Sequence, residues 1–82
     1  MYITQDKLPV IPSTKLIAFL EKIDFINIHQ KGSHVRLKHK DGRIVTVPHH
    51  SDQSVSKGLL RRIINDLGIS KLEFIELYNT VM

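Results

Sequence analysis

Three residues with complementary chemistry occupy every second position in the segment 32–39. The segment reads Gly-Ser-His-Val-Arg-Leu-Lys-His, and its alternation of polar and apolar side chains predicts a short β-strand. In such a strand His34, Arg36 and Lys38 share one face, while the apolar residues between them point to the other. An imidazole titrates near pH ~6.5 and can exchange a proton at neutral pH, and the two cations can bind phosphate. The pattern therefore indicates chemistry on a phosphodiester.

Each of these residues has a candidate role. His34 can act as a general base or acid on the 2′-hydroxyl of RNA or on the leaving oxygen. Arg36 lies about 7 Å and Lys38 about 14 Å further along the strand, and a guanidinium can hold a phosphate through several donors. Lys57 and Arg61 are four residues apart at the start of a predicted helix and are suited to a backbone phosphate. The competing interpretation is an ordinary solvated basic surface.

Other polar residues carry weaker signals. Gly32 is expected to serve the geometry of a turn, because glycine accepts a positive φ. His49 and His50 are adjacent, so their side chains point apart in an extended chain and suit a single metal ion poorly. The spacings of zinc sites and the glycine loops of phosphate-binding enzymes do not occur, and we expect His29 and His39 to be solvated. We therefore predict no metal site and no cofactor.

The charge of the chain is concentrated in its middle. The net charge is +4, but residues 31–62 hold eight basic and two acidic groups, which gives +6. The remainder holds four basic and six acidic groups, which gives −2. A basic segment of this kind is typical of a protein that binds a polyanion. On charge alone, a solvated strand-and-helix surface is an equally good interpretation.

Length and composition predict one small domain over residues 1–82. The chain has no cysteine, which excludes disulfides and thiolate metal sites and is compatible with a reducing cytosol. The longest apolar run, residues 16–20, is far too short to span a bilayer. No basic N-terminal region followed by an apolar stretch indicates a signal peptide. We therefore expect a cytoplasmic protein without a membrane partner.

The first half of the chain predicts a helix and three strands. Ser13 is the expected N-cap of a helix that stops near Asp24. Residues 25–30 are the first expected strand, with Ile26 and Ile28 on the core face, followed by strands at 33–39 and 43–47. Between the last two, Asp41 and Gly42 predict a type I′ hairpin turn, which needs positive φ at both residues.

The second half predicts two helices. The first starts near Ser56 and ends at Gly68, a residue suited to the left-handed C′ position. Its expected buried residues are Leu59, Leu60, Ile63, Ile64 and Leu67. Ser70 and Glu73 form a capping box for a short third helix. That helix is expected to bury Leu72, Phe74, Ile75 and Leu77. The fold class is therefore α+β, with one face of an antiparallel sheet on the helices and the other open to solvent or ligand.

Taken together, these segments resemble the HicA family of toxins, also called YcfA-like. The resemblance covers roughly residues 7–78. The Gly-Ser-His stretch combined with the later Lys-Gly-x-Leu-Arg stretch is fairly specific. The resemblance is carried by Lys7-Leu8-Pro9, residues 16–22, Phe25, Gln30-Lys31-Gly32-Ser33-His34, Asp41-Gly42-Arg43, Val45-Thr46-Val47-Pro48, residues 57–64 and residues 67–70. The chain departs from the family at Asp24, where glycine is common, and at Leu59, where a small residue is common.

The resemblance implies a fold similar to the double-stranded-RNA-binding domain and an mRNA interferase activity. It implies that His34 is catalytic and that a HicB-type antitoxin neutralises the protein. We expect the RNA, single-stranded or structured, to contact a set of residues around that histidine and on the second helix. These are Lys31, Gly32, Ser33, Arg36, Lys38, Lys57 and Arg61.

Two other functions fit the same residues. A non-catalytic RNA-binding module on this fold would use the basic strand without His34 chemistry. A protein-interaction module would use the exposed sheet to dock an acidic partner. If a HicB-type antitoxin is that partner, we expect it to cover His34.

Overall fold

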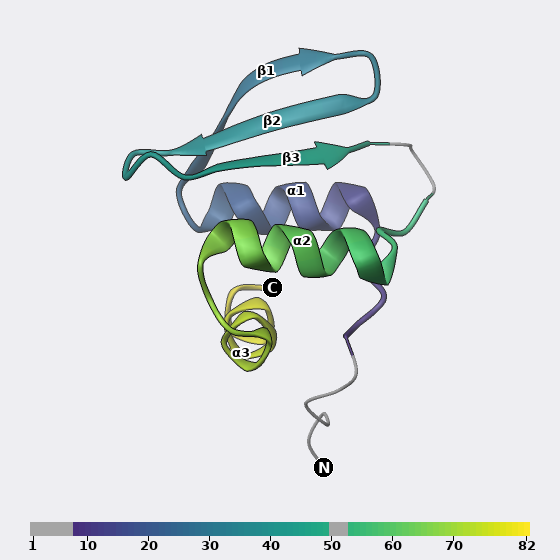
Figure 1. Ribbon diagram of the computed structural model, residues 1–82, viewed down its shortest axis with the longest axis vertical. Helices are drawn as coiled ribbons and strands as arrows, with labels where there is room; N and C mark the ends of the chain where they lie inside the picture. The colour runs from purple at the N-terminus through teal and green to yellow at the C-terminus, as the bar shows by residue number, and fades with distance from the viewer. Residues whose placement is uncertain (1–7, 50–52) are drawn as a thin grey trace.

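The computed structural model describes residues 8–49 and 53–82 (Figure 1). Three strands form one antiparallel sheet in the order β1-β2-β3, and the helices gather on one side of it (Figure 1). The expected α+β class and the helix-strand-strand-strand-helix-helix order are confirmed. The elements are α1 (Ser13–Lys22), β1 (Phe25–Lys31), β2 (His34–His39), β3 (Ile44–Pro48), α2 (Lys57–Leu67) and α3 (Lys71–Val81).

The two strands β2 and β3 each bury alternate residues. Val35 and Leu37 of β2 and Val45 and Val47 of β3 are at most 2% exposed, and the residues between them are exposed. Because side chains alternate along a strand, one sheet face is sealed against the helices and the other is open. The buried side chains join those of α1, α2 and α3 in one hydrophobic core. This arrangement holds the polar residues of β2 rigidly on the open face.

Strand β1 differs from the prediction in the face it presents. Ile26 and Ile28 are 66% and 50% exposed, so their expected place on the core face is wrong. Phe25, which is buried, sets the alternation instead, and Ile26 pairs with the exposed Lys38. The register then shifts between Asn27 and His29, which indicates a β-bulge. Beyond Phe25 this edge strand has no buried residue.

The start of α1 also differs from the prediction. The N-cap is Pro12 rather than Ser13, because the Pro12 carbonyl already accepts the N–H groups of Lys15 and Leu16. Ser13 is instead buried, and its hydroxyl lies 3.2 Å from Nδ1 of His49. At the other end, α1 stops before Asp24, as expected, and this residue adopts a φ of 76°. An aspartate tolerates this left-handed conformation, so the departure from glycine is accommodated.

The loop joining β2 to β3 is not a type I′ turn. The Gly42 N–H donates to the His39 carbonyl at 2.9 Å, and Gly42 has a φ of 101°. Asp41 does not share that positive φ, and a type I′ turn would need it. Its carboxylate instead accepts from the backbone N–H of Arg43 at 3.0 Å, which stabilises the turn locally. Arg43 also donates to the carbonyl of Leu67 at 2.7 Å and so ties this hairpin to the end of α2.

Helix α2 begins and ends at its predicted signals, and α3 begins at its predicted capping box. The Ser56 hydroxyl accepts from the Leu59 N–H, Gly68 ends α2 with a φ of 75°, and Ser70 and Glu73 form the capping box. The expected burial of Leu72 is wrong, since this residue is 44% exposed. Leu59 and Leu77 are only partly buried against the core. In the described ranges, no helix combines the length and apolar character needed to cross a membrane.

Candidate nucleic-acid interface

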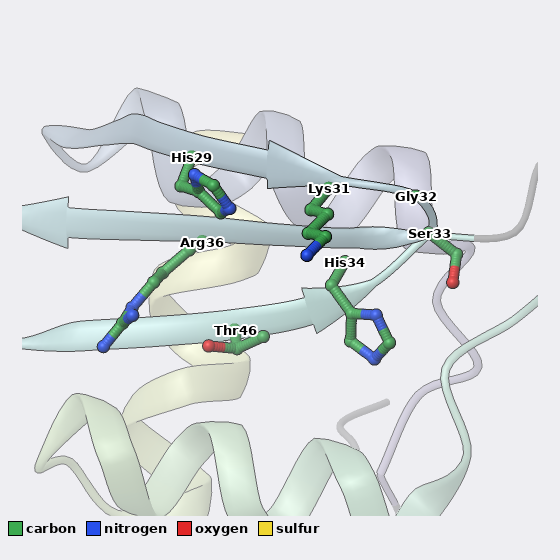
Figure 2. A pocket seen from close by; sticks show the side chains of 7 residues that line it. All are labelled: His29, Lys31, Gly32, Ser33, His34, Arg36 and Thr46. Carbon is green, nitrogen blue, oxygen red and sulfur yellow. The ribbon is translucent and has the colours of Figure 1, made fainter.

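The polar residues of β2 and their cross-strand neighbours share the open face of the sheet. Lys31 of β1 pairs with His34, His29 pairs with Arg36, and Thr46 of β3 pairs with Arg36 from the other side. Paired residues on neighbouring strands point to the same face. Figure 2 shows these side chains standing on that face, with α1 behind the sheet and α2 beyond β3. Three strands thus place five polar side chains side by side.

These side chains surround a shallow depression, here called the cationic hollow. It has a volume of about 580 Å³. Its lining includes two imidazoles, one ammonium and one guanidinium, and among the described residues no carboxylate (Figure 2). Such a lining favours an anion such as a phosphate. The lining residues are His29, Lys31, Gly32, Ser33, His34, Arg36 and Thr46.

The turn between β1 and β2 fixes His34 at the end of its strand. Gly32 has a φ of 58°, which confirms the expected left-handed turn glycine. The carbonyl of Ser33 accepts the backbone N–H of His49, so β3 holds the turn from the side. The His49 ring in turn lies beside the buried hydroxyl of Ser13. A chain of contacts therefore runs from the start of α1 to the residue that precedes His34.

A second depression lies between β3 and α2 and is here called the β3–α2 hollow. Its volume is about 410 Å³. It shares His34 and Thr46 with the cationic hollow, so the imidazole of His34 stands at the border of both. One face of α2 lines it, because Leu59, Arg62, Ile63 and Asp66 follow the three- and four-residue spacing of a helix. The lining residues are His34, Ile44, Thr46, Pro48, Leu59, Arg62, Ile63 and Asp66.

The structure brings together only part of the predicted RNA-binding set. Lys31, Gly32, Ser33 and Arg36 line the cationic hollow with His34. Lys38 is exposed on the same face but lies at the far end of β2, opposite Ile26 and Ile44, and lines neither hollow.

The two predicted cations of α2 are not among the residues that line the two hollows. Lys57 is exposed at the first position of the helix and lines neither hollow. Arg61 lines a separate depression with Ile64, Asn65, Ile69 and Lys71. RNA binding by Lys38, Lys57 and Arg61 stays a prediction.

Four polar lining residues were not among the predicted site residues: His29, Thr46, Arg62 and Asp66. His29 was expected to be merely solvated. It has the same parity as the core-facing Phe25, and only the bulge in β1 turns it to the open face beside Arg36. No local sequence signal marks that bulge. For Arg62 and Asp66 the signal is their helical spacing, which places both on the helix face that also carries Leu59 and Ile63.

The resolved pKa shifts belong to structural contacts outside both hollows. Hydrogen bonding from the Arg43 backbone, reinforced by the Arg43 side chain, lowers the pKa of Asp41 despite some desolvation. Hydrogen bonds from the backbone and side chain of Ser70 lower the pKa of Glu73 in the capping box. Neither carboxylate lines a hollow. Both lowered pKa values therefore reflect hydrogen bonds that stabilise a turn and a helix cap.

Potential metal-ligating side chains do not cluster in the described residues. Within residues 8–49 and 53–82, no group of three or more His, Asp or Glu side chains is arranged to hold a metal ion. His50 and Lys7, which the sequence analysis also considered, lie outside the described residues.

Comparison with known proteins identifies the family of the chain. A protein-family model described as the HicA toxin of bacterial toxin-antitoxin matches residues 13–69. The match runs from the start of α1 past the end of α2 and includes every residue that lines the two hollows. No curated protein matches the chain.

Proposed function

The chain belongs to the HicA toxin family of bacterial toxin–antitoxin systems, and we propose that it is an mRNA interferase. In this proposal it is an endoribonuclease that needs no metal ion and uses His34 for proton transfer. Arg36 and Lys31 bind the phosphate at the cleavage site. A HicB-type antitoxin neutralises it.

One observation carries this proposal: His34 is exposed on a sheet face where two of its neighbours are cations. Lys31 is its partner on β1, and Arg36 lies two residues along β2 on the same face. Because no carboxylate of the described residues lines the cationic hollow, none of them repels a phosphate there. A phosphodiester held by these cations lies within reach of the imidazole.

The reaction that suits this arrangement is attack by the neighbouring ribose. The 2′-hydroxyl loses its proton as its oxygen bonds to phosphorus, the bond from phosphorus to the 5′-oxygen breaks, and that oxygen gains a proton. His34 carries one of these two proton transfers, and solvent water carries the other. The products are a 2′,3′-cyclic phosphate and a 5′-hydroxyl end. A placed proton-transfer group is typically worth ~10²–10⁴ in rate, which suits a slow nuclease.

The cations have a second role besides binding. Negative charge builds up on the phosphate oxygens as the 2′-oxygen attacks, and the planar donors of Arg36 can follow that charge. Gly32 and Ser33 form the turn that presents His34, and their backbone can approach the RNA closely because Gly32 has no side chain. Lys38 extends the cationic surface along β2 for neighbouring phosphates.

The antitoxin is proposed to act on the same face by occlusion. The face is open, carries several cations and surrounds His34, so an acidic partner that covers it blocks access to RNA. Protection of the His34 ring proton signals in a complex with the HicB-type protein checks this. Unchanged solvent access of His34 in a tight complex would contradict inhibition by occlusion.

The activity itself is tested with purified protein and a long single-stranded RNA in excess EDTA. We expect cleavage to continue in EDTA and the fragments to carry 5′-hydroxyl ends. RNA that is retarded in a gel but stays intact would instead identify a non-catalytic RNA-binding module. Cleavage that EDTA abolishes would refute the metal-independent mechanism.

A further inference from the structure

We propose that the β3–α2 hollow binds one nucleobase of the RNA, next to the phosphate held at His34. Within it, Asp66 and Arg62 select a base that carries an exocyclic amino group over uracil. This inference rests on the proposed function, because it adds base selection to the same RNA surface. It concerns Arg62 and Asp66, two residues that the cleavage mechanism itself does not use.

The position of the hollow argues for a base rather than a second phosphate. It shares His34 and Thr46 with the cationic hollow, so an RNA strand with a phosphate at His34 has an adjacent nucleotide at the β3–α2 hollow. Its volume of about 410 Å³ exceeds that of a single pyrimidine or purine ring. The two hollows therefore form one continuous surface.

The walls of the hollow suit the flat face of a base. Ile44, Pro48 and Leu59 supply apolar surface, and Ile44 is 37% exposed, whereas Ile63 is almost fully buried. Contact with these side chains removes apolar area of the base from water. Among the described residues the only aromatic ring in this lining is the imidazole of His34, and stacking on a ring tolerates any base, so stacking does not discriminate. Discrimination must then come from the polar rim.

The rim consists of a carboxylate and a guanidinium on one helix face. Arg62 and Asp66 are four residues apart on α2, and both are exposed. In the described residues the ion pairs are those of Asp41 with His39 and Arg43, so no direct ion pair joins Arg62 to Asp66. Both groups are available to a ligand.

Within residues 8–49 and 53–82, Asp66 is the only carboxylate that lines either hollow. A carboxylate beside a phosphate-binding surface weakens anion binding, so its contact with the RNA is best made to a neutral donor group. An ionised carboxylate only accepts hydrogen bonds, and the amino group of cytosine, adenine or guanine donates them. Uracil has no amino group: its one donor at this edge, N3–H, is flanked by two carbonyl oxygens, which the carboxylate repels. Arg62 complements the amino group by donating to ring nitrogen or carbonyl acceptors of the same base.

The test compares two short RNA strands that differ at one base. One is an oligouridine and the other is the same strand with a single central cytidine, which matches uridine in ring size. Both carry 2′-fluoro groups, so that no 2′-hydroxyl is present and the wild-type protein cannot cleave them. Binding is followed by fluorescence anisotropy for the wild type, Asp66→Asn and Asp24→Asn. The last variant makes the same chemical change in an exposed turn, where asparagine also tolerates the left-handed backbone.

We expect the wild type and Asp24→Asn to bind the cytidine strand about tenfold more tightly than oligouridine. Asp66→Asn should reduce that ratio to about one, since an amide offers both a donor and an acceptor. Equal affinity of the wild type for both strands, or a cytidine preference that persists in Asp66→Asn, would overturn the proposal. Because these strands cannot be cleaved, the result is independent of whether the protein cuts RNA. Failure of the proposed function shows separately, as intact RNA in the EDTA assay.

Discussion

Replacement of Gly32 by alanine isolates the backbone conformation that presents His34. Gly32 has a φ of 58°, and a Cβ built at this position meets no atom within 4 Å. The added methyl group therefore collides with nothing, and the whole effect comes from the left-handed backbone. That conformation costs an L-residue roughly 1–2 kcal/mol.

The unfolded chain reduces the net effect. Alanine has fewer unfolded conformations than glycine, which returns about 0.4–1 kcal/mol of stability. The expected net loss in the free energy of unfolding is therefore about 1 kcal/mol. For a domain of this size, a change of 1 kcal/mol moves Tm by roughly 4–8 °C.

Gly58 provides the matched control. It lies in the first turn of α2, has no positive φ, and a Cβ built there also meets nothing within 4 Å. Gly58→Ala should therefore stabilise the protein, by up to about 1 kcal/mol, because alanine favours a helix. The same chemical change is thus expected to act with opposite sign at two open positions.

Urea unfolding monitored by circular dichroism measures both variants against the wild type, with equal m-values as the check on two-state behaviour. Gly32→Asn adds a third point and should lose less than Gly32→Ala, because asparagine tolerates the left-handed region. A Gly32→Ala variant at least as stable as the wild type would refute the argument that this turn requires glycine.

Three further perturbations test the phosphate contact, the hairpin and the support behind His34. Arg36→Ala should reduce the salt slope of single-stranded RNA binding by about 0.7, whereas Lys22→Ala on α1 should leave it unchanged; an unchanged slope in Arg36→Ala removes that residue from the interface. Contacts with Arg43 lower the pKa of Asp41 below its ordinary value of 3.8, so the charged carboxylate stabilises the folded state. This stabilisation is fully present above pH 3.8 and is lost as the pH falls through the lowered pKa. The stability advantage of the wild type over Asp41→Asn, measured by urea unfolding, should therefore shrink on acidification, and a constant difference would contradict it. Ser13→Ala should lose about 1 kcal/mol in the same assay, because the buried hydroxyl lies within hydrogen-bond distance of His49, and an unchanged midpoint would argue against that contact.

The helices and strand β2 could be predicted because their signals are local. Gly68, Ser70 and Glu73 mark helix ends through their own backbone and capping chemistry, and the structure confirms them. The alternation of β2 places His34 and Arg36 on one face without any knowledge of the neighbouring strands. Short-range rules suffice wherever the deciding contact lies within a few residues.

Strand β1 could not be predicted in the same way. Its buried face depends on whether Phe25 or Ile26 begins the alternation. That choice is made by the packing of the strand against the helices and not by the residues of the strand alone. Phe25 is buried and Ile26 is not. The bulge that follows turns His29 to the open face, and only the pairing with β2 reveals it.

The role of α2 in the interface depends on tertiary placement. The helical pattern correctly identified Leu60 and Ile63 as buried, but it does not show which flank of the helix lies beside β3. That flank carries Arg62 and Asp66, whereas Arg61 lines a different depression. The residues of the turn next to His34 could be predicted as part of the same site because they are neighbours of His34 in the chain.

The most direct test of the account is the RNA cleavage rate of His34→Ala, measured beside its free energy of unfolding. His34 is exposed, so the substitution should change stability by no more than about 0.5 kcal/mol. We expect the rate of cleavage to fall by ~10²–10⁴ while the protein stays folded and still binds RNA. A folded His34→Ala variant that cleaves RNA at the wild-type rate would contradict the assignment of His34 as the proton-transfer group.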